Sequence, residues 1–132
     1  MSWTLIDHTG DVGIDVVAPT REAMFAEAAR AMFSILADLP AEPAGTEEVL
    51  ALPEGDVAEA LRDFLGELLF RFSEGRRMYV AFEPLCGAVE ARWEPYDAVR
   101  HPLRTELKAV TWHQLAAAES GGGWTARVIF DV

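Results

Sequence analysis

Oxygen-bearing side chains crowd into one short stretch near the N-terminus, Asp7-His8-Thr9-Gly10-Asp11, which holds two carboxylates, an imidazole and a hydroxyl. Paired hard oxygen donors are the ligands that Mg²⁺ and Ca²⁺ prefer. Asp, Thr and Gly are also typical turn residues. The segment therefore has two interpretations from its residues alone, an ordinary turn or part of a divalent-cation site.

The last two residues supply a second set of oxygens. Asp131 and Val132 close a predicted strand at 124–132, so a carboxylate and the terminal backbone oxygens lie together at one strand end. If this strand lies beside a predicted strand at 11–18, Asp11 and Asp131 converge. Anions held close together repel one another unless a cation lies between them. This pattern supports the hypothesis of a cation site at Asp11, Asp131 and Val132.

A third segment, Lys108-Ala109-Val110-Thr111-Trp112-His113, adds a cation and an imidazole. In a strand, Lys108 and Trp112 share one face and His113 lies on the other. Lys108 has two interpretations, an exposed edge charge or a group that neutralises the acidic site. His8 and His113 likewise have two, a structural histidine or a contributor to that site.

Several kinds of chemistry lack a signature. Gly121-Gly122-Gly123 precedes a predicted strand and not a helix, which is typical of a hairpin turn and not of a phosphate-binding loop. There is no Gly-x-Ser-x-Gly motif that would mark a serine nucleophile. Cys86 is the only cysteine, which excludes an internal disulfide and a multi-cysteine zinc site.

Composition predicts an ordinary globular protein. The 132 residues are 51% hydrophobic and 25% charged, and suit a single domain over 1–132. Eleven basic against 22 acidic residues give a net charge of −11, which disfavours direct high-affinity binding to nucleic acid. No basic segment followed by an apolar run opens the chain, and no apolar run reaches the ~20 residues of a membrane span. We expect a cytoplasmic protein with no membrane contact.

Hydrophobic periodicity predicts two helices and about seven strands. Thr20 and Asp56 are candidate helix caps. The second helix is expected over 56–74, with Gly75 as its C-terminal stop. We expect this second helix to form the spine of the core. Strands are expected at 2–6, 11–18, 46–52, 77–83, 87–94, 106–115 and 124–132. The predicted fold class is α+β, a single domain in which both helices pack on a largely antiparallel β-sheet.

Three motifs in this order resemble the archease family. His8-Thr9-Gly10-Asp11-Val12-Gly13 is similar to the family's His-Thr-Ala-Asp-(Ile/Val)-Gly pattern, with Gly10 in place of Ala. The segment from Lys108 to His113 is similar to Lys-Ala-(Ile/Val)-Thr-(Tyr/Trp)-His, and the ending at 128–132 to the family's terminal strand and Asp. Residues 64–69 also resemble its Leu-Glu-Glu-Leu-Leu stretch. The resemblance covers nearly the whole chain, but the region 95–105 matches no family pattern.

The resemblance implies an accessory protein and not a stand-alone enzyme. Archeases act with the RtcB-type RNA ligase in tRNA splicing and RNA repair, where they promote its guanylylation and multiple turnover, and GTP is bound only through the ligase. The family's metal site would map onto Asp11, Asp131 and Val132, with calcium the expected ion and magnesium or manganese as alternatives. Lys108, His8 and His113 would belong to the same functional patch.

Two other readings stay open at this stage. One is a metal-dependent phosphoryl-transfer enzyme that uses Asp11 and Asp131 as ligands and His8 or His113 as its base. The other is an interaction module whose metal is only structural. Both share the acidic site with the archease reading, so they differ in what the site does and not in where it lies.

Overall fold

The structure is a computed structural model that describes residues 1–8 and 10–132, and of His8 only the backbone. Thr9 of the first motif therefore lies outside the described residues. The elements follow in the order β1 (Ser2–His8), β2 (Asp11–Ala18), α1 (Arg21–Leu36), β3 (Thr46–Ala51), α2 (Val57–Gly75), β4 (Arg77–Leu85), β5 (Ala88–Pro95), β6 (Ala109–Val110), β7 (Ala116–Ser120) and β8 (Gly123–Asp131). The α+β class predicted from the sequence is confirmed.

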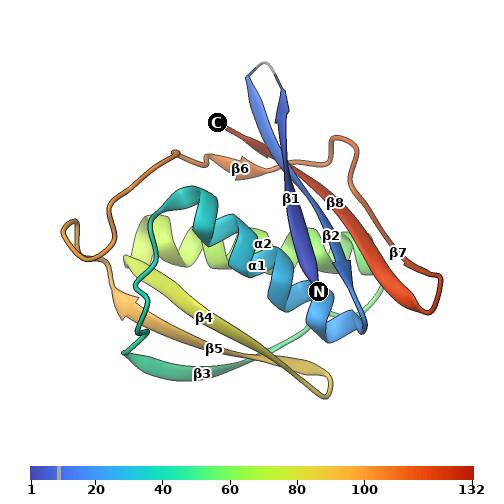
Figure 1. Ribbon diagram of the computed structural model, residues 1–132, viewed down its shortest axis with the longest axis horizontal. Coiled ribbons are helices and arrows are strands. Elements are labelled where there is room, and N and C mark those ends of the chain that lie inside the picture. Colours follow the sequence, from blue (N-terminus) through green and yellow to red (C-terminus); the bar gives the residue numbers. More distant parts are fainter. Residues whose placement is uncertain (9) are drawn as a thin grey trace.

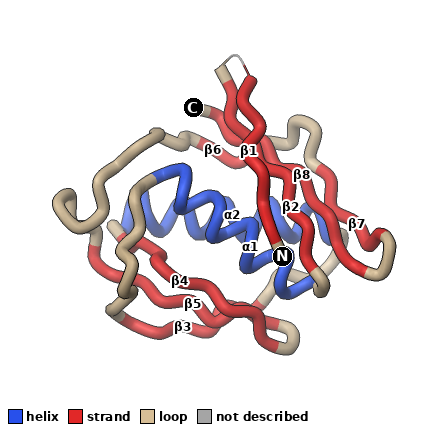
Figure 2. Tube along the Cα trace, in the orientation of Figure 1, coloured by secondary structure: helices blue, strands red, loops and turns tan. Residues whose placement is uncertain are grey.

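The strands divide into two sheets, where the sequence analysis expected one. One sheet has the order β1-β2-β8-β6, with β7 also paired to β8, and the other has the order β3-β5-β4. All of these pairings are antiparallel. Figure 1 shows both helices between the two groups of strands, and Figure 2 shows how loops link the groups. Helix α1 lies between the sheets because its buried residues surround most of the helix and need apolar cover on more than one side.

Helix α1, and not α2, is the most deeply buried element. Thr20 caps it, since its hydroxyl accepts a hydrogen bond from the Ala23 N–H at 3.1 Å. Twelve of its 16 residues are buried, against seven of 19 in α2. The expectation that the second helix forms the spine of the core is therefore wrong. Small alanines around most of α1 let both sheets approach this helix closely. A helix that packs on one side only would need just one apolar stripe.

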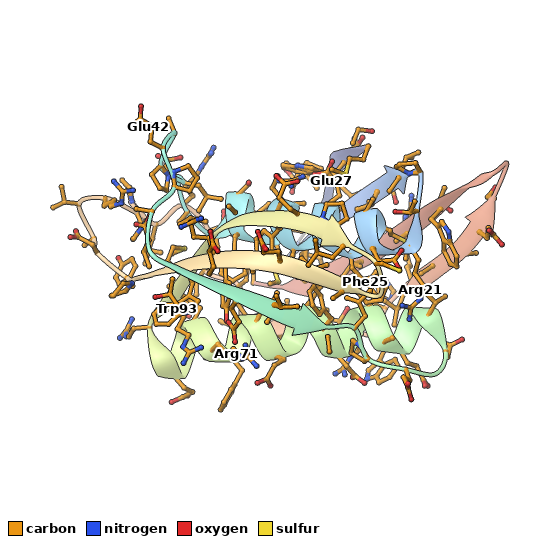
Figure 3. The ribbon with its side chains drawn as sticks, turned by 90° about the horizontal axis from the view of Figure 1, so that it is seen from below. Arg21, Phe25, Glu27, Glu42, Arg71 and Trp93 are labelled. Carbon is orange, nitrogen blue, oxygen red and sulfur yellow. The ribbon has the colours of Figure 1, made fainter. Side chains whose placement is uncertain are left out.

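Helix α2 has the predicted start and buried face. The Asp56 carboxylate accepts a hydrogen bond from the Glu59 N–H at 3.1 Å. The predicted stop differs by one residue, because Arg76 and not Gly75 takes the left-handed conformation, with a φ of 56°. From this helix Arg71 reaches β3, where it lies 3.1 Å from the Glu48 carboxylate (Figure 3). Neither helix has the length and apolarity to cross a membrane, for the residues that the structure describes.

The predicted strand at 106–115 is the largest local difference. Only the two residues of β6 pair with β8, and a turn separates them from β7. Thr111 makes this turn, because its hydroxyl donates to the Ile129 carbonyl at 2.9 Å and accepts from the His113 N–H at 3.2 Å. Gln114 then adopts a left-handed φ of 51°, which a continuous strand does not allow.

Truncation of Phe64 tests the packing of α2. Phe64 is 5% exposed, and its ring meets that of Phe25 edge-on with centroids 5.4 Å apart. We expect Phe64→Ala to lower the free energy of unfolding by about 3–5 kcal/mol, because it leaves a cavity between the helices. Urea denaturation measures this. An effect like that of Phe70→Ala, on the exposed face of the same helix, would contradict the packing described.

Candidate functional site

Two aspartates face each other at the end of the larger sheet. Asp11 of β2 and Asp131 of β8 are direct partners in the antiparallel register. Side chains at directly opposite positions share one face of a sheet, with Cβ atoms roughly 4.5–5.5 Å apart. Asp131 is exposed and Asp11 half-buried, so both are open to solvent. The same row continues through the backbones of His8 on β1 and Ala109 on β6.

A contrast within the same two strands sets this pair apart. Four residues along β2, on the same face of the sheet, Asp15 lies opposite Arg127, which donates two hydrogen bonds to the Asp15 carboxylate at 2.8 and 2.9 Å. These hydrogen bonds hold the pKa of Asp15 below its usual value. Asp11 instead has another carboxylate opposite. Like charges at directly opposite positions destabilise a sheet, so the Asp11–Asp131 pair costs free energy unless a cation neutralises it.

Glycines fix the register and the turn beside the pair. Between the two rows, Gly13 lies opposite Ile129, and a Cβ on Gly13 would lie 2.9 Å from the Val128 carbonyl oxygen and clash with the Ile129 side chain. Only glycine leaves room there. Gly10 has a φ of +81°, a conformation that glycine adopts without strain. The replacement of the family's Ala by Gly10 therefore suits this turn.

A backbone hydrogen bond joins Lys108 to Asp131. Its N–H donates to the Asp131 carbonyl at 2.8 Å, just before β6 begins. The residue is exposed and lines a groove against α2. No ion pair joins Lys108 to a carboxylate within the part of the chain that the structure describes. Its ammonium is thus available to a partner.

Composition holds a signal at Lys108 that the sequence analysis missed. It is the only lysine, and the other ten basic residues are arginines. Eight of these arginines form ion pairs, Arg21 donates to the Pro53 carbonyl, and Arg76 lies over the Tyr96 ring. Lys108, the only residue with a compact ammonium, has no such contact among the described residues. This indicates a role for Lys108 that arginine does not fill.

The structure places His113 in the turn after β6. His113 is exposed there, and its N–H donates to the Thr111 hydroxyl, which in turn donates to the Ile129 carbonyl, two residues before Asp131 on β8. Its neighbour Gln114 accepts a hydrogen bond from Arg127 at 3.2 Å. Val132, in contrast, directly follows Asp131 and packs half-buried against the core. The side chain of His8 lies outside the described residues.

The donor set left at the end of the sheet is made of oxygen. Within residues 1–8 and 10–132, as far as they are described, no three His, Cys, Asp or Glu side chains cluster closely enough to hold a metal. The candidate set is therefore two carboxylates, of Asp11 and Asp131, and the backbone oxygens of Val132. Hard oxygen donors of this kind fit Ca²⁺, Mg²⁺ or Mn²⁺ and do not fit a soft metal.

An ionic cluster around two buried residues, Glu94 and His101, anchors the loop that leads to Lys108. His101 is fully buried; its Nδ1 accepts a hydrogen bond from the Asp97 N–H at 3.0 Å, so its Nε2–H donates to Glu94 at 2.8 Å. Arg100 donates to the other Glu94 oxygen at 2.9 Å, as does the Ala44 N–H. Chiefly because of Arg100, the pKa of Glu94 falls to about 2. Asp97, Arg100 and His101 of this cluster lie in the region 95–105, where the sequence offered no interpretation.

Comparison with known proteins assigns the family. Residues 3–132 match the model of the Archease protein family. The chain belongs to the archease family. It is 36% identical over 140 residues to the protein archease of Methanopyrus kandleri, with 100% of both chains covered. It is 32% identical to that of Methanosarcina barkeri, with 98% of this chain and 95% of the relative covered.

Solved structures agree with this assignment. A solution structure of a Methanobacterium thermoautotrophicum protein has a TM-score of 0.69 and 28% identity, over 99% of both chains. A crystal structure from Thermotoga maritima, described as an "archease, possible chaperone", has a TM-score of 0.68 over 96% of this chain and 94% of that one. At 19% identity the latter shows a shared fold alone. The archease resemblance of the sequence motifs is thereby confirmed.

Acid titration tests the Glu94 cluster. A carboxyl whose pKa drops to about 2 on folding stabilises the protein fully above its usual value of 4.5, and this contribution fades as the pH falls toward 2. We expect Glu94→Gln to lower the free energy of unfolding by roughly 1.5–3 kcal/mol near neutral pH, and by less at about pH 3. Urea denaturation at both pH values measures this. Glu83→Gln, at an exposed site on β4, is the control. An equal loss at both pH values would contradict the assignment.

Proposed function

We propose that the chain is an accessory activator of an RtcB-type RNA ligase, and that it promotes the ligase's guanylylation and multiple turnover in tRNA splicing and RNA repair. The observation that carries the proposal is the pair of opposed carboxylates, Asp11 and Asp131, beside the only lysine of the chain. Membership of the archease family supports it. The activator is not itself an enzyme, and it meets GTP only through the ligase.

The acidic pair supplies the oxygens of a cation site. Asp11, Asp131 and the backbone oxygens of Val132 would hold Ca²⁺, or Mg²⁺ or Mn²⁺ in its place. When bound, the ion supplies positive charge that can contact phosphate oxygens. The chain's own role is to hold these oxygens at an exposed sheet end, where β2 and β8 fix their separation. Lys108 adds an ammonium that can contact a phosphate as a point charge.

The overall charge favours a basic partner. A net charge of −11 repels nucleic acid but attracts a protein whose own surface binds RNA. The alternative of a metal-dependent phosphoryl-transfer enzyme has less support, because the sequence has neither a phosphate-binding loop nor a serine-nucleophile motif. The purified protein alone should therefore neither ligate RNA nor hydrolyse GTP.

Calcium titration tests the acidic pair. In a chelator we expect Asp131→Asn to leave the free energy of unfolding unchanged or to raise it by about 0.2–1 kcal/mol, because it removes like-charge repulsion across β2 and β8. Calcium should raise the Tm of the wild type and not that of Asp131→Asn. The matched control is Asp15→Asn, which loses the Arg127 contact, lowers the Tm and keeps the calcium shift. A calcium shift that survives in Asp131→Asn would refute the site.

Multiple-turnover ligation tests Lys108. Lys108→Ala should have the Tm of the wild type, because an exposed lysine that forms no ion pair with the described residues contributes little to stability. It should nevertheless weaken stimulation of the ligase. Lys108→Arg separates a purely electrostatic role, which survives the exchange, from one that needs the compact ammonium. Arg104→Ala, at another exposed cation, is the control. Wild-type stimulation by Lys108→Ala at every metal concentration would show that Lys108 is an ordinary surface charge.

A further inference from the structure

Two aromatic side chains stand out on the surface. Phe70 and Trp112 are each 58% exposed, and they are the only aromatic residues among the large exposed hydrophobic side chains that the structure describes. Single exposed aliphatic residues are normal on a protein surface. Exposed aromatics that gather at one place are instead typical of residues that dominate the energy of a protein–protein interface.

Phe70 lines one groove, and Trp112 contacts another residue that lines it. The groove has a volume of about 420 Å³ and lies between α2, which contributes Gly66, Leu69 and Phe70, and the segment before and within β6, which contributes Leu107, Lys108 and Val110. Arg62 also lines it, and its guanidinium carbon lies 4.2 Å from the centre of the Trp112 ring. This stacking holds Trp112 beside the groove, which reduces the entropy lost when a partner binds.

Gly66 leaves the floor of the groove open. Glycine within a helix destabilises it by roughly 0.5–1 kcal/mol relative to alanine. Folding of the chain does not require this glycine, because a Cβ at position 66 would meet no atom within 4 Å. The absence of a side chain instead creates space into which a partner's side chain can enter between α2 and β6.

Charge decides between the candidate occupants. The charged side chains that line the groove are mixed, with Arg62 and Lys108 against Asp63, so the net charge of the chain is the deciding quantity. A second copy of the chain would carry the same net charge of −11 and would be repelled, as would nucleic acid. A basic protein surface that offers one apolar side chain matches both the net acidic charge of the chain and the apolar floor of the groove.

The groove is continuous with the acidic pair. Lys108 lines the groove, and its N–H bonds to the Asp131 carbonyl at 2.8 Å. A protein bound in the groove therefore extends directly to the residues of the proposed cation site. We infer that the groove is the docking surface for the ligase, a basic partner that inserts an apolar side chain over Gly66, beside Phe70. This inference rests on the proposed function for the identity of the partner.

Direct binding to the RtcB-type RNA ligase of the same organism tests the groove, by biolayer interferometry with the full-length proteins. We expect Gly66→Gln to weaken binding about tenfold or more, because its side chain fills the groove, while its Tm stays the same or rises. Phe70→Ala and Trp112→Ala should weaken binding to a similar extent. Gly66→Ala, which adds one carbon, and Val99→Ala, at a 90% exposed loop position, should bind like the wild type.

Ligation measured against the concentration of this protein separates docking from activation. Groove variants should need more protein for half-maximal stimulation but reach the wild-type maximum. Asp131→Asn should bind like the wild type and give a lower maximum. If the wild type binds without stimulating, the proposed function fails, and the binding of the groove variants still decides the inference.

Three results would overturn the inference. The first is wild-type affinity in both Gly66→Gln and Phe70→Ala. The second is no binding of the wild type to the ligase. The third is a dimer of the chain, detected by analytical ultracentrifugation, that Gly66→Gln dissociates, because the groove would then hold a second copy.

Discussion

The antiparallel pairing of β2 with β8 joins the two ends of the chain, and the candidate site depends on its register. That register places Asp11 opposite Asp131 and, four residues further along β2, Asp15 opposite Arg127. A slip of one residue would move every one of these side chains to the other face of the sheet. Gly13 prevents such a slip, because no other residue fits beneath Ile129. The Asp15–Arg127 pair and the close packing at Gly13 therefore stabilise the pairing of β2 with β8, whose open end brings two carboxylates together.

The rest of the fold serves to support that sheet from behind. Helix α1 is buried between the two sheets, so the core is continuous from β4 through α1 to β2 and β8. The Glu94–Arg100–His101 cluster fixes the long connection from β5, which then runs past the end of α1 and brings Lys108 to the edge of β8. A short β6 suffices because backbone hydrogen bonds from Lys108 and Thr111 to β8 flank it.

Two surfaces of different chemistry meet at Lys108. One is the acidic end of the larger sheet, whose exposed oxygens suit a cation. The other is the groove between α2 and β6, whose aromatic rim and open floor at Gly66 suit an apolar side chain of a partner. An accessory protein needs both properties, because it must bind its partner and also present a chemical group to it. In the proposed function, the groove supplies affinity and the acidic pair supplies activation, so different substitutions should affect the two.

Local sequence determined the parts of this protein whose causes are local. The strand at 11–18, the caps at Thr20 and Asp56 and the apolar face of α2 follow from periodicity and capping, and the family follows from its three motifs. Tertiary structure decided the rest. It divided the predicted strand at 106–115, because Thr111 bonds to Ile129, which lies 18 residues later in the chain. It gave Asp15 an arginine partner and Asp11 a carboxylate, although both aspartates sit in the same strand. It also exposed Phe70 and Trp112 beside one groove, since which apolar residues stay uncovered depends on contacts between distant segments that no local pattern records.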